Sequence, residues 1–180
     1  MIAPPAPHPP LRDAAIVLRR YTEADVDELT AALQDPEIAE WTNVPAPYTR
    51  DHALRFIAEG PPGFSELALG ICDAGDGRLL GSVGVRLDEV QRCAEMGYWV
   101  AADERGRGVA TRAIRLVSRW AIGELGVGRV QILAAPDNAA SRRAAEQAGF
   151  TAEGTLRAYR VQKDRRVDLV MHSLLPGEEA

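Results

Sequence analysis

The chain has 180 residues, of which 46% are hydrophobic and 26% charged, and its formal net charge at pH 7 is −5. This length predicts one domain with a full hydrophobic core. The negative charge argues against nucleic acid and favours a cationic or amine-bearing partner. No apolar stretch is long enough to span a bilayer, so no membrane partner is expected. Cys72 and Cys93 are too few for a disulfide scaffold, and no Cys/His spacing predicts a metal site.

The start of the chain is rich in proline. Residues 1–13 are expected to form a disordered or polyproline-like tail. This tail lacks the basic and apolar regions of a secretory signal, so we expect a cytoplasmic protein. Residues 14–176 are predicted to form the domain, and residues 177–180 a short C-terminal tail.

The first half of the domain predicts a strand, two helices and an antiparallel meander. Thr22 is expected to cap the first helix, and Pro36 to end that helix or start another turn. Thr49 or Asp51 is expected to start the second helix. The Gly75-Asp76-Gly77 turn is typical of a hairpin. The predicted strands cover residues 15–19, 64–72, 79–87 and 94–101.

The second half alternates helices with strands. A helix is predicted over about 107–122, and a second from Asn138 to Ala148, closed by Gly149. The predicted strands cover 130–134, a region from Phe150, and 166–174. This order indicates an α/β fold with a mixed sheet, whose parallel part lies around the 107–122 crossover helix.

The stretch from Arg105 to Thr111 joins an apolar strand to a helix start. Gly106 and Gly108 let the backbone turn and let another molecule lie close to it. The first N–H groups of the helix lack internal partners, and the helix dipole makes this end positive. With the charges of Arg105 and Arg107, the stretch predicts a phosphate or pyrophosphate site. The alternative is a tight turn with solvated arginines.

The spacing [Q/R]-x-x-G-x-[G/A], matched by Arg105, Gly108 and Ala110, resembles the acyl-CoA pyrophosphate loop of the GNAT N-acetyltransferases. Four further stretches resemble the ribosomal-protein N-terminal acetyltransferase branch, the Rim type. They are Leu18-Arg19 with Tyr21 to Asp25, Glu95 to Val100, Asn138-x-x-Ser141 with Ala148-Gly149-Phe150, and Glu153 to Arg157. The resemblance covers about residues 15–174. It implies a single-domain, mostly antiparallel sheet with flanking helices, in which the central parallel strands 94–101 and 130–134 splay apart.

The resemblance also implies an activity: transfer of an acetyl group from acetyl-CoA, as co-substrate, to a primary amine. The amine would attack directly in a ternary complex, without a metal. The acceptor would be a protein N-terminal α-amine or a small-molecule amine. By similarity, the residues expected to bind acetyl-CoA are Val100, Arg105, Gly106, Arg107, Gly108, Val109, Ala110, Thr111, Asn138 and Ser141.

Two residues are candidates for the chemistry. An alkyl amine attacks only when neutral, yet its pKa is about 10.4, so a base must take its proton. Glu95 is the candidate, acting directly or through a water, and a backbone N–H near Val100 would stabilise the oxyanion. The family's usual tyrosine is absent around Ala144 and Ala145, so Ser141 is the candidate proton donor to the thiolate. The alternative for Glu95 is an exposed carboxylate paired with Arg86, and for Ser141 a helix cap.

A second function class stays open, a non-catalytic acyl-CoA-binding sensor or partner module. The segments expected to set acceptor specificity, about 36–50 and 157–165, carry no motif that identifies the acceptor. A homodimer is possible because the edge strands of the sheet need cover.

Overall fold

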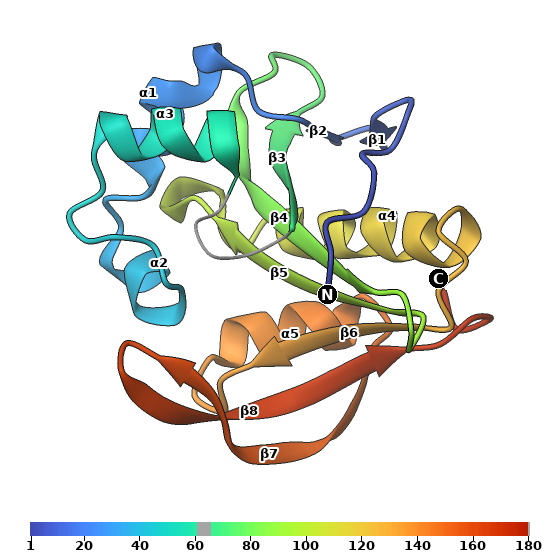
Figure 1. The fold of residues 1–180 in the computed structure, drawn as a ribbon. Helices are drawn as coiled ribbons and strands as arrows, with labels where there is room; N and C mark the ends of the chain where they lie inside the picture. The colour runs from blue at the N-terminus through green and yellow to red at the C-terminus, as the bar shows by residue number, and fades with distance from the viewer. Residues whose placement is uncertain (61–65, 180) are drawn as a thin grey trace.

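The structure is a computed structural model that describes residues 1–60 and 66–179. Within these residues, eight strands form one sheet in the order β1-β2-β3-β4-β5-β6-β8-β7 (Figure 1). Neighbouring strands are antiparallel except for β5 and β6, which are parallel. The prediction of a mixed, mostly antiparallel sheet with a central parallel pair is therefore confirmed.

The elements follow the predicted order with three additions: β1, a third helix before β3, and a 3-10 turn after β5. The strands are β1 Leu11–Arg12, β2 Ile16–Arg19, β3 Leu67–Asp73, β4 Leu79–Asp88, β5 Cys93–Val100, β6 Arg129–Ala134, β7 Thr151–Gln162 and β8 Arg165–Leu174. The helices are the 3-10 turns η1 Glu23–Asp25 and η2 Ala102–Glu104, and α1 Val26–Ala32, α2 Pro36–Trp41, α3 Arg50–Glu59, α4 Val109–Gly123 and α5 Ala139–Gln147.

The additional helix α2 begins at Pro36, where the sequence left open a helix end or the start of another turn. Pro36 occupies the first position of α2, and the side chain of Asp35 accepts a hydrogen bond from the Glu37 N–H. Proline at the first helical position loses no intrahelical bond, and an Asp cap satisfies a free N–H group. The same proline can therefore end one helix and start the next.

Three segments differ from, or lie outside, what the sequence predicted. The proline-rich start is not detached from the sheet: β1 pairs with β2, and Ile2 exchanges two 2.7 Å backbone hydrogen bonds with Leu87. Residues 157–165, expected to be a loop, form the end of a long β7–β8 hairpin, whose tight turn has positive φ at Lys163 and Asp164. The part of the predicted 64–72 strand that precedes residue 66 lies outside the described residues.

The sheet separates two hydrophobic clusters. Helices α4 and α5 pack on one face, with Ala94 and Met96 of β5 in their cluster. Helices α1, α2 and α3 pack on the other face, where Trp99 of β5 joins their cluster. Side chains alternate along a strand, so Glu95 and Gly97 face the same side as Trp99. We call this side the α1–α3 face.

Within the described residues, no helix is both long and apolar enough to cross a membrane. The same residues contain no group of three or more His, Cys, Asp or Glu side chains that could hold a metal ion.

The close approach of β4 and β5 at Gly81 generates a testable prediction. A Cβ added at Gly81 would lie 2.3 Å from the Trp99 carbonyl oxygen, a backbone atom that cannot rotate away. We expect Gly81→Ala to lower the free energy of unfolding by about 1–3 kcal/mol, measured by urea denaturation. The control is Gly97→Ala on β5, where no described atom lies within 4 Å of the added Cβ. Equal stability of the two variants would contradict the prediction.

Candidate active site

The parallel strands β5 and β6 separate after four residue pairs. Their pairing runs from Cys93 with Arg129 to Met96 with Ile132, whereas β5 continues to Val100 and β6 to Ala134. Beyond Met96, the β6-facing edge of β5 therefore has no strand beside it in this ladder. The result is an opening in the middle of the sheet that backbone groups line.

Val100 contributes its backbone to this opening. The Ala101 N–H donates to the Leu80 carbonyl oxygen over 2.9 Å, next to the Gly81–Val100 pair. This bond places Val100 at a non-hydrogen-bonded position of the β4–β5 ladder, where a residue's own N–H and C=O point away from the partner strand. The peptide groups of Val100 are thus directed toward the opening, where they can bind an amide-containing ligand.

The predicted phosphate cradle follows η2 and leads into α4. Gly106 has φ 74° and Gly108 has φ 76°, and no described atom lies within 4 Å of a Cβ added at either position. The first α-helical hydrogen bond of α4 runs from the Arg112 N–H to the Gly108 carbonyl oxygen. The N–H groups from Val109 to Thr111 therefore have no partner within the helix, and they lie beside open glycine backbone.

The two arginines of the cradle are held by carboxylates. Arg105 pairs with Asp35 and, over 2.6 Å, with Glu37 of α2. Arg107 lies 3.1 Å from Glu104, and its side chain is 64% exposed. These pairs offset the positive charge that the sequence predicted for a phosphate, so the backbone N–H groups are the donors that remain for an anion at this loop. Arg105 instead ties the loop to α2.

The start of α5 lies across the opening from β5. The Asn138 side chain accepts a hydrogen bond from the Ser141 N–H over 3.0 Å, which makes Asn138 the cap of α5. The Tyr98 hydroxyl donates to the Ser141 carbonyl oxygen over 2.9 Å and lies 3.0 Å from Ser141 Oγ. Burial raises the pKa of Tyr98 to about 12, so its hydroxyl stays protonated and keeps this hydrogen bond to the Ser141 carbonyl oxygen.

Tyr98 is a site residue that the sequence did not reveal. It lies within the Glu95 to Val100 stretch that identified the strand, but nothing in the sequence placed it against Ser141, 43 positions later. A tyrosine is therefore present next to the predicted proton donor, although it comes from β5 and not from α5.

Glu95 lies on the α1–α3 face in a network of side chains from four strands. Its carboxylate pairs with Arg86 of β4 and with Arg160 of β7 over 2.7 Å, and it accepts from Gln131 of β6 over 3.2 Å. The predicted pairing with Arg86 is present, but the side chain is buried, with 3% exposed, rather than exposed. This network joins β7 to the centre of the sheet.

A second carboxylate, Glu66, lies on the same face and was not singled out from the sequence. It immediately precedes β3, and its Oε2 lies 3.9 Å from Arg86 Nε, which is longer than a hydrogen bond. Burial raises the pKa of the Glu66 carboxyl above its ordinary value; Arg86 and Arg160 oppose this shift, and Glu95 adds to it. No local motif marks the residue, because its environment comes from other strands.

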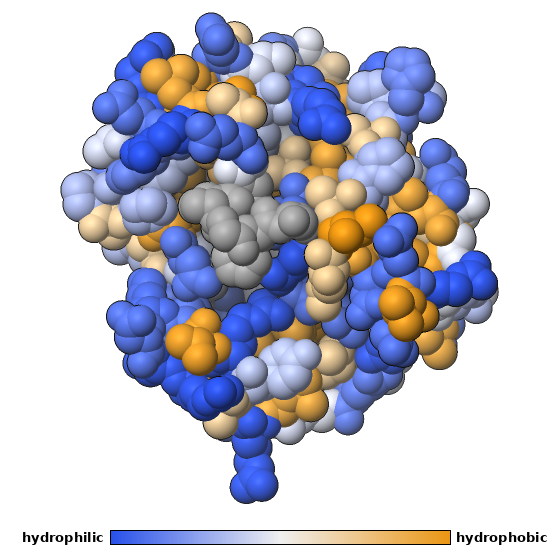
Figure 2. Space-filling model, viewed as in Figure 1, coloured by the Kyte–Doolittle hydropathy of each residue, from blue (hydrophilic) through white to orange (hydrophobic). Residues whose placement is uncertain are grey.

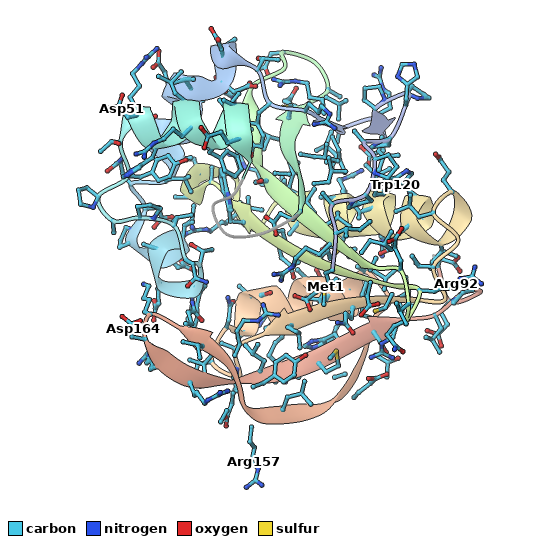
Figure 3. All side chains as sticks on the ribbon, viewed as in Figure 1. Met1, Asp51, Arg92, Trp120, Arg157 and Asp164 are labelled. Atoms are coloured by element: carbon cyan, nitrogen blue, oxygen red, sulfur yellow. The ribbon has the colours of Figure 1, made fainter. Side chains whose placement is uncertain are left out.

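The two segments expected to set acceptor specificity meet beside this face. The Lys163 Nζ donates to the Ala39 carbonyl oxygen over 2.5 Å, and Gln162 Nε2 donates to that of Glu40 over 3.2 Å. Asp164, labelled in Figure 3, marks this hairpin turn next to α2. A cavity of about 370 Å³ lies beside α2, and Lys163 reaches it from the hairpin; its other lining residues are Leu33, Gln34, Pro36, Ala39, Glu40, Ala46, Pro47 and Tyr48.

The surface around this side of the molecule is largely hydrophilic. Figure 2 shows polar residues over α3 and over the β7–β8 hairpin, with hydrophobic residues in small, separate groups. Such a surface suits a polar or charged acceptor better than an apolar one.

Comparison with known proteins places this arrangement in a family. A family model described as "Acetyltransferase (GNAT) domain" matches residues 15–151. The "Putative ribosomal N-acetyltransferase YdaF" of Bacillus subtilis is 41% identical over 104 residues, which span 57% of this chain and 57% of that protein.

Two solved structures from Vibrio cholerae share the fold. A "putative ribosomal-protein-serine acetyltransferase" superimposes with a TM-score of 0.83 and is 19% identical in sequence. The superposition covers 95% of this chain and 99% of the chain of that structure. A spermidine N-acetyltransferase in complex with CoA and spermine superimposes with a TM-score of 0.75 and is 20% identical in sequence. This superposition covers 92% of this chain and 98% of the chain of that structure. These comparisons confirm the GNAT resemblance inferred from the sequence, and the names of the Bacillus subtilis relative and of the first Vibrio cholerae structure refer to ribosomal-protein acetyltransferases. The chain belongs to the GNAT family of acetyltransferases.

Proposed function

We propose that this protein transfers an acetyl group from acetyl-CoA to a primary amine, by direct attack of the amine in a ternary complex. The observation that carries the proposal is the coincidence of the opened β5–β6 edge with the glycine cradle at the start of α4. One feature offers peptide groups to an amide-bearing chain, and the other offers N–H groups to phosphates. Acetyl-CoA carries both chemistries in one molecule.

The residues present fit this co-substrate. The open space at Gly106 and Gly108 leaves room for a pyrophosphate against the N–H groups of Val109, Ala110 and Thr111. The side chain of Val109 is buried, so this residue can contribute only its backbone. The peptide of Val100 would bind the pantetheine arm, and Asn138 and Ser141 would lie along it. When bound, acetyl-CoA supplies a thioester, an activated acetyl group.

Ser141 is the residue that we assign to the leaving sulfur. Its hydroxyl lies 3.0 Å from that of Tyr98, which stays protonated at neutral pH because its pKa is about 12. The hydroxyls of Tyr98 and Ser141 thus form a hydrogen-bonded pair beside the opening. Glu95 remains the candidate to order the acceptor side, through a water rather than directly, because two arginines and Gln131 already occupy its oxygens.

The acceptor that we propose is a protein N-terminal α-amine or a small-molecule amine. The name of the Bacillus subtilis relative supports the first class, and that of the spermidine enzyme supports the second. Both classes are cationic at neutral pH, which agrees with the net charge of −5.

The alternative function is a non-catalytic acyl-CoA sensor or partner module. It shares the cradle and the opened strands with the enzyme, and it differs only in needing no proton transfer. The absence of a tyrosine around Ala144 and Ala145 favoured this alternative. Calorimetric titration of acetyl-CoA followed by a thiol-release assay across amines and N-terminal peptides separates the two, because a sensor binds without releasing thiol.

The cradle generates one prediction. We expect Gly108→Glu to abolish acetyl-CoA binding, because the side chain would fill the open space and place a negative charge against the phosphates. The matched control is Gly77→Glu in the β3–β4 turn, since Gly77 has a similar φ of 79° and equally open surroundings. Calorimetry should show that Gly108→Glu raises the Kd for acetyl-CoA by about 100-fold or more. The Kd of Gly77→Glu should equal that of the wild type. Equal affinity in both would remove the cradle from the proposal.

The Tyr98–Ser141 pair generates another prediction. We expect Ser141→Ala to lower kcat about 100-fold. Tyr98→Phe keeps the ring and removes the hydroxyl that orients Ser141, so it should lower kcat by a smaller factor. If Tyr98 acts through Ser141, adding Tyr98→Phe to Ser141→Ala should cause no further loss. Thiol-release kinetics of the two single variants and the double variant measure this. If the loss of kcat in the double variant equals the product of the two single losses, the hydroxyls act separately.

A further inference from the structure

Two glycines lie opposite each other on the α1–α3 face, next to the point where β5 and β6 separate. Gly84 of β4 pairs directly with Gly97 of β5. Gly97 is exposed and is the first β5 residue after the last pair with β6 at Met96. A Cβ added at Gly97 would meet no described atom within 4 Å. The sheet surface over Gly97 is therefore bare backbone beside the opening, where an acceptor amine can reach the acetyl group.

The carboxylate of Glu66 lies over the other glycine of this pair. A Cβ added at Gly84 would lie 2.7 Å from Glu66 Oε1, so the carboxylate rests directly on that backbone. Paired residues in an antiparallel ladder have Cα atoms about 5 Å apart. Glu66 is thus close enough to reach an amine above Gly97 directly or through one water.

Glu66 and Glu95 have contrasting surroundings on this one face. Glu95 is 3% exposed, pairs with Arg86 and Arg160, and also accepts from Gln131. The Glu66 side chain is 23% exposed, and its Oε2 lies 3.9 Å from Arg86 Nε. The oxygens of Glu95 are already bound by two arginines and an amide. Among the described residues, Glu66 has one ion-pair partner at a longer distance, so its carboxylate can accept a proton more readily. Two carboxyls held in such different environments typically divide the roles of a site.

We infer that Glu66 is the general base that takes the proton from the acceptor amine, and that Glu95 is a positioning residue that holds Arg86 and Arg160 around it. This inference rests on the proposed acetyl transfer. It replaces both roles considered for Glu95, that of a direct base and that of a residue that orders the acceptor through a water.

In the proposed acetyl transfer, every proton of the acceptor amine is accounted for. The acceptor enters as an ammonium ion, and Glu66 takes one proton, which frees the nitrogen lone pair. That pair forms the N–C bond to the acetyl carbon as the C–S bond breaks and the sulfur leaves with its electrons. The surplus N–H proton neutralises the thiolate, and Glu66 then returns its own proton to solvent. The products are the amide and free thiol.

The charges that face Glu66 agree with this role. Burial raises the pKa of its carboxyl, Glu95 on β5 adds to the shift, and Arg86 on β4 and Arg160 on β7 oppose it. The carboxyl therefore titrates closer to neutral pH than an ordinary glutamate and is a better proton acceptor. A raised pKa in the folded state also means that the folded protein binds more protons than the unfolded chain, so stability falls as pH rises past about 4.5.

The test compares Glu66→Gln with Glu95→Gln in the full chain. The probes are spermidine and a peptide with an N-terminal serine, with thiol release followed from pH 6 to 9.5 and acetyl-CoA affinity measured by calorimetry. We expect Glu66→Gln to lower kcat at pH 7 by about 10²–10⁴-fold, with acetyl-CoA affinity unchanged. The deficit should shrink as pH rises toward the pKa of the amine, because the acceptor then loses its proton unaided. A purely structural role for Glu66 would give the same deficit at every pH.

Urea denaturation at pH 7 gives a readout that needs no acceptor. We expect Glu66→Gln to be at least as stable as the wild type, because it removes a charge that burial disfavours. Glu95→Gln should be less stable, because it leaves two arginines without their buried partner. Wild-type kinetics in Glu66→Gln, or a pH-independent deficit, would overturn the inference while leaving the proposed function intact. Wild-type protein that binds no acetyl-CoA would instead contradict the proposed function itself.

Discussion

The site depends on the point at which two parallel strands stop pairing. Backbone N–H and C=O groups in a sheet are normally used up by neighbouring strands. Here β5 and β6 share four residue pairs and then separate, so peptide groups of β5 beyond Met96 become available in the middle of the sheet. Everything else in the site is arranged around this interruption. The cradle lies at the end of β5, the start of α5 lies across the gap, and Gly97 borders it on the α1–α3 face.

An interrupted ladder needs other interactions to hold its two sides in place. On the α4–α5 side, Tyr98 connects β5 to the first turn of α5. On the α1–α3 face, Glu95 gathers Arg86, Arg160 and Gln131, so that β4, β5, β6 and β7 are linked through one carboxylate. The ion pairs of Arg105 with α2 fix the cradle loop in the same way. Buried or half-buried charged pairs of this kind contribute more to a defined geometry than to net stability. In contrast, Arg157 on β7 points away from the body of the protein into solvent (Figure 3).

Most of the fold could be predicted from the sequence, because local patterns specify local structure. Thr49 and Asn138 cap helices where they were expected to, and Gly149 follows α5 with φ 102°. The Asp76-Gly77 turn joins two strands, as its residues predict. The differences arise where long-range pairing decides. The proline-rich start joins the sheet because Ile2 and β1 find partners in β4 and β2, and residues 157–165 become strand because β8 pairs with them. A proline can also serve either end of a helix, so the start of α2 at Pro36 was not resolved by local preference.

By itself, the sequence determined the family and the helix caps, and it indicated the co-substrate chemistry that the family implies and the position of the candidate cradle. These features are short stretches in which neighbouring residues act together, as in Arg105 to Thr111. Only the tertiary structure decided which charges are available for chemistry. The arginines of the cradle are paired with acids, one of them with acids about 70 positions earlier, and Glu95 is enclosed by residues from three other strands. Tyr98 meets Ser141, and Glu66 lies over Gly84, only because the sheet folds them together. The ionisation of a side chain and the groups that it can contact depend on its neighbours in space. The order of residues along the chain does not specify these neighbours directly.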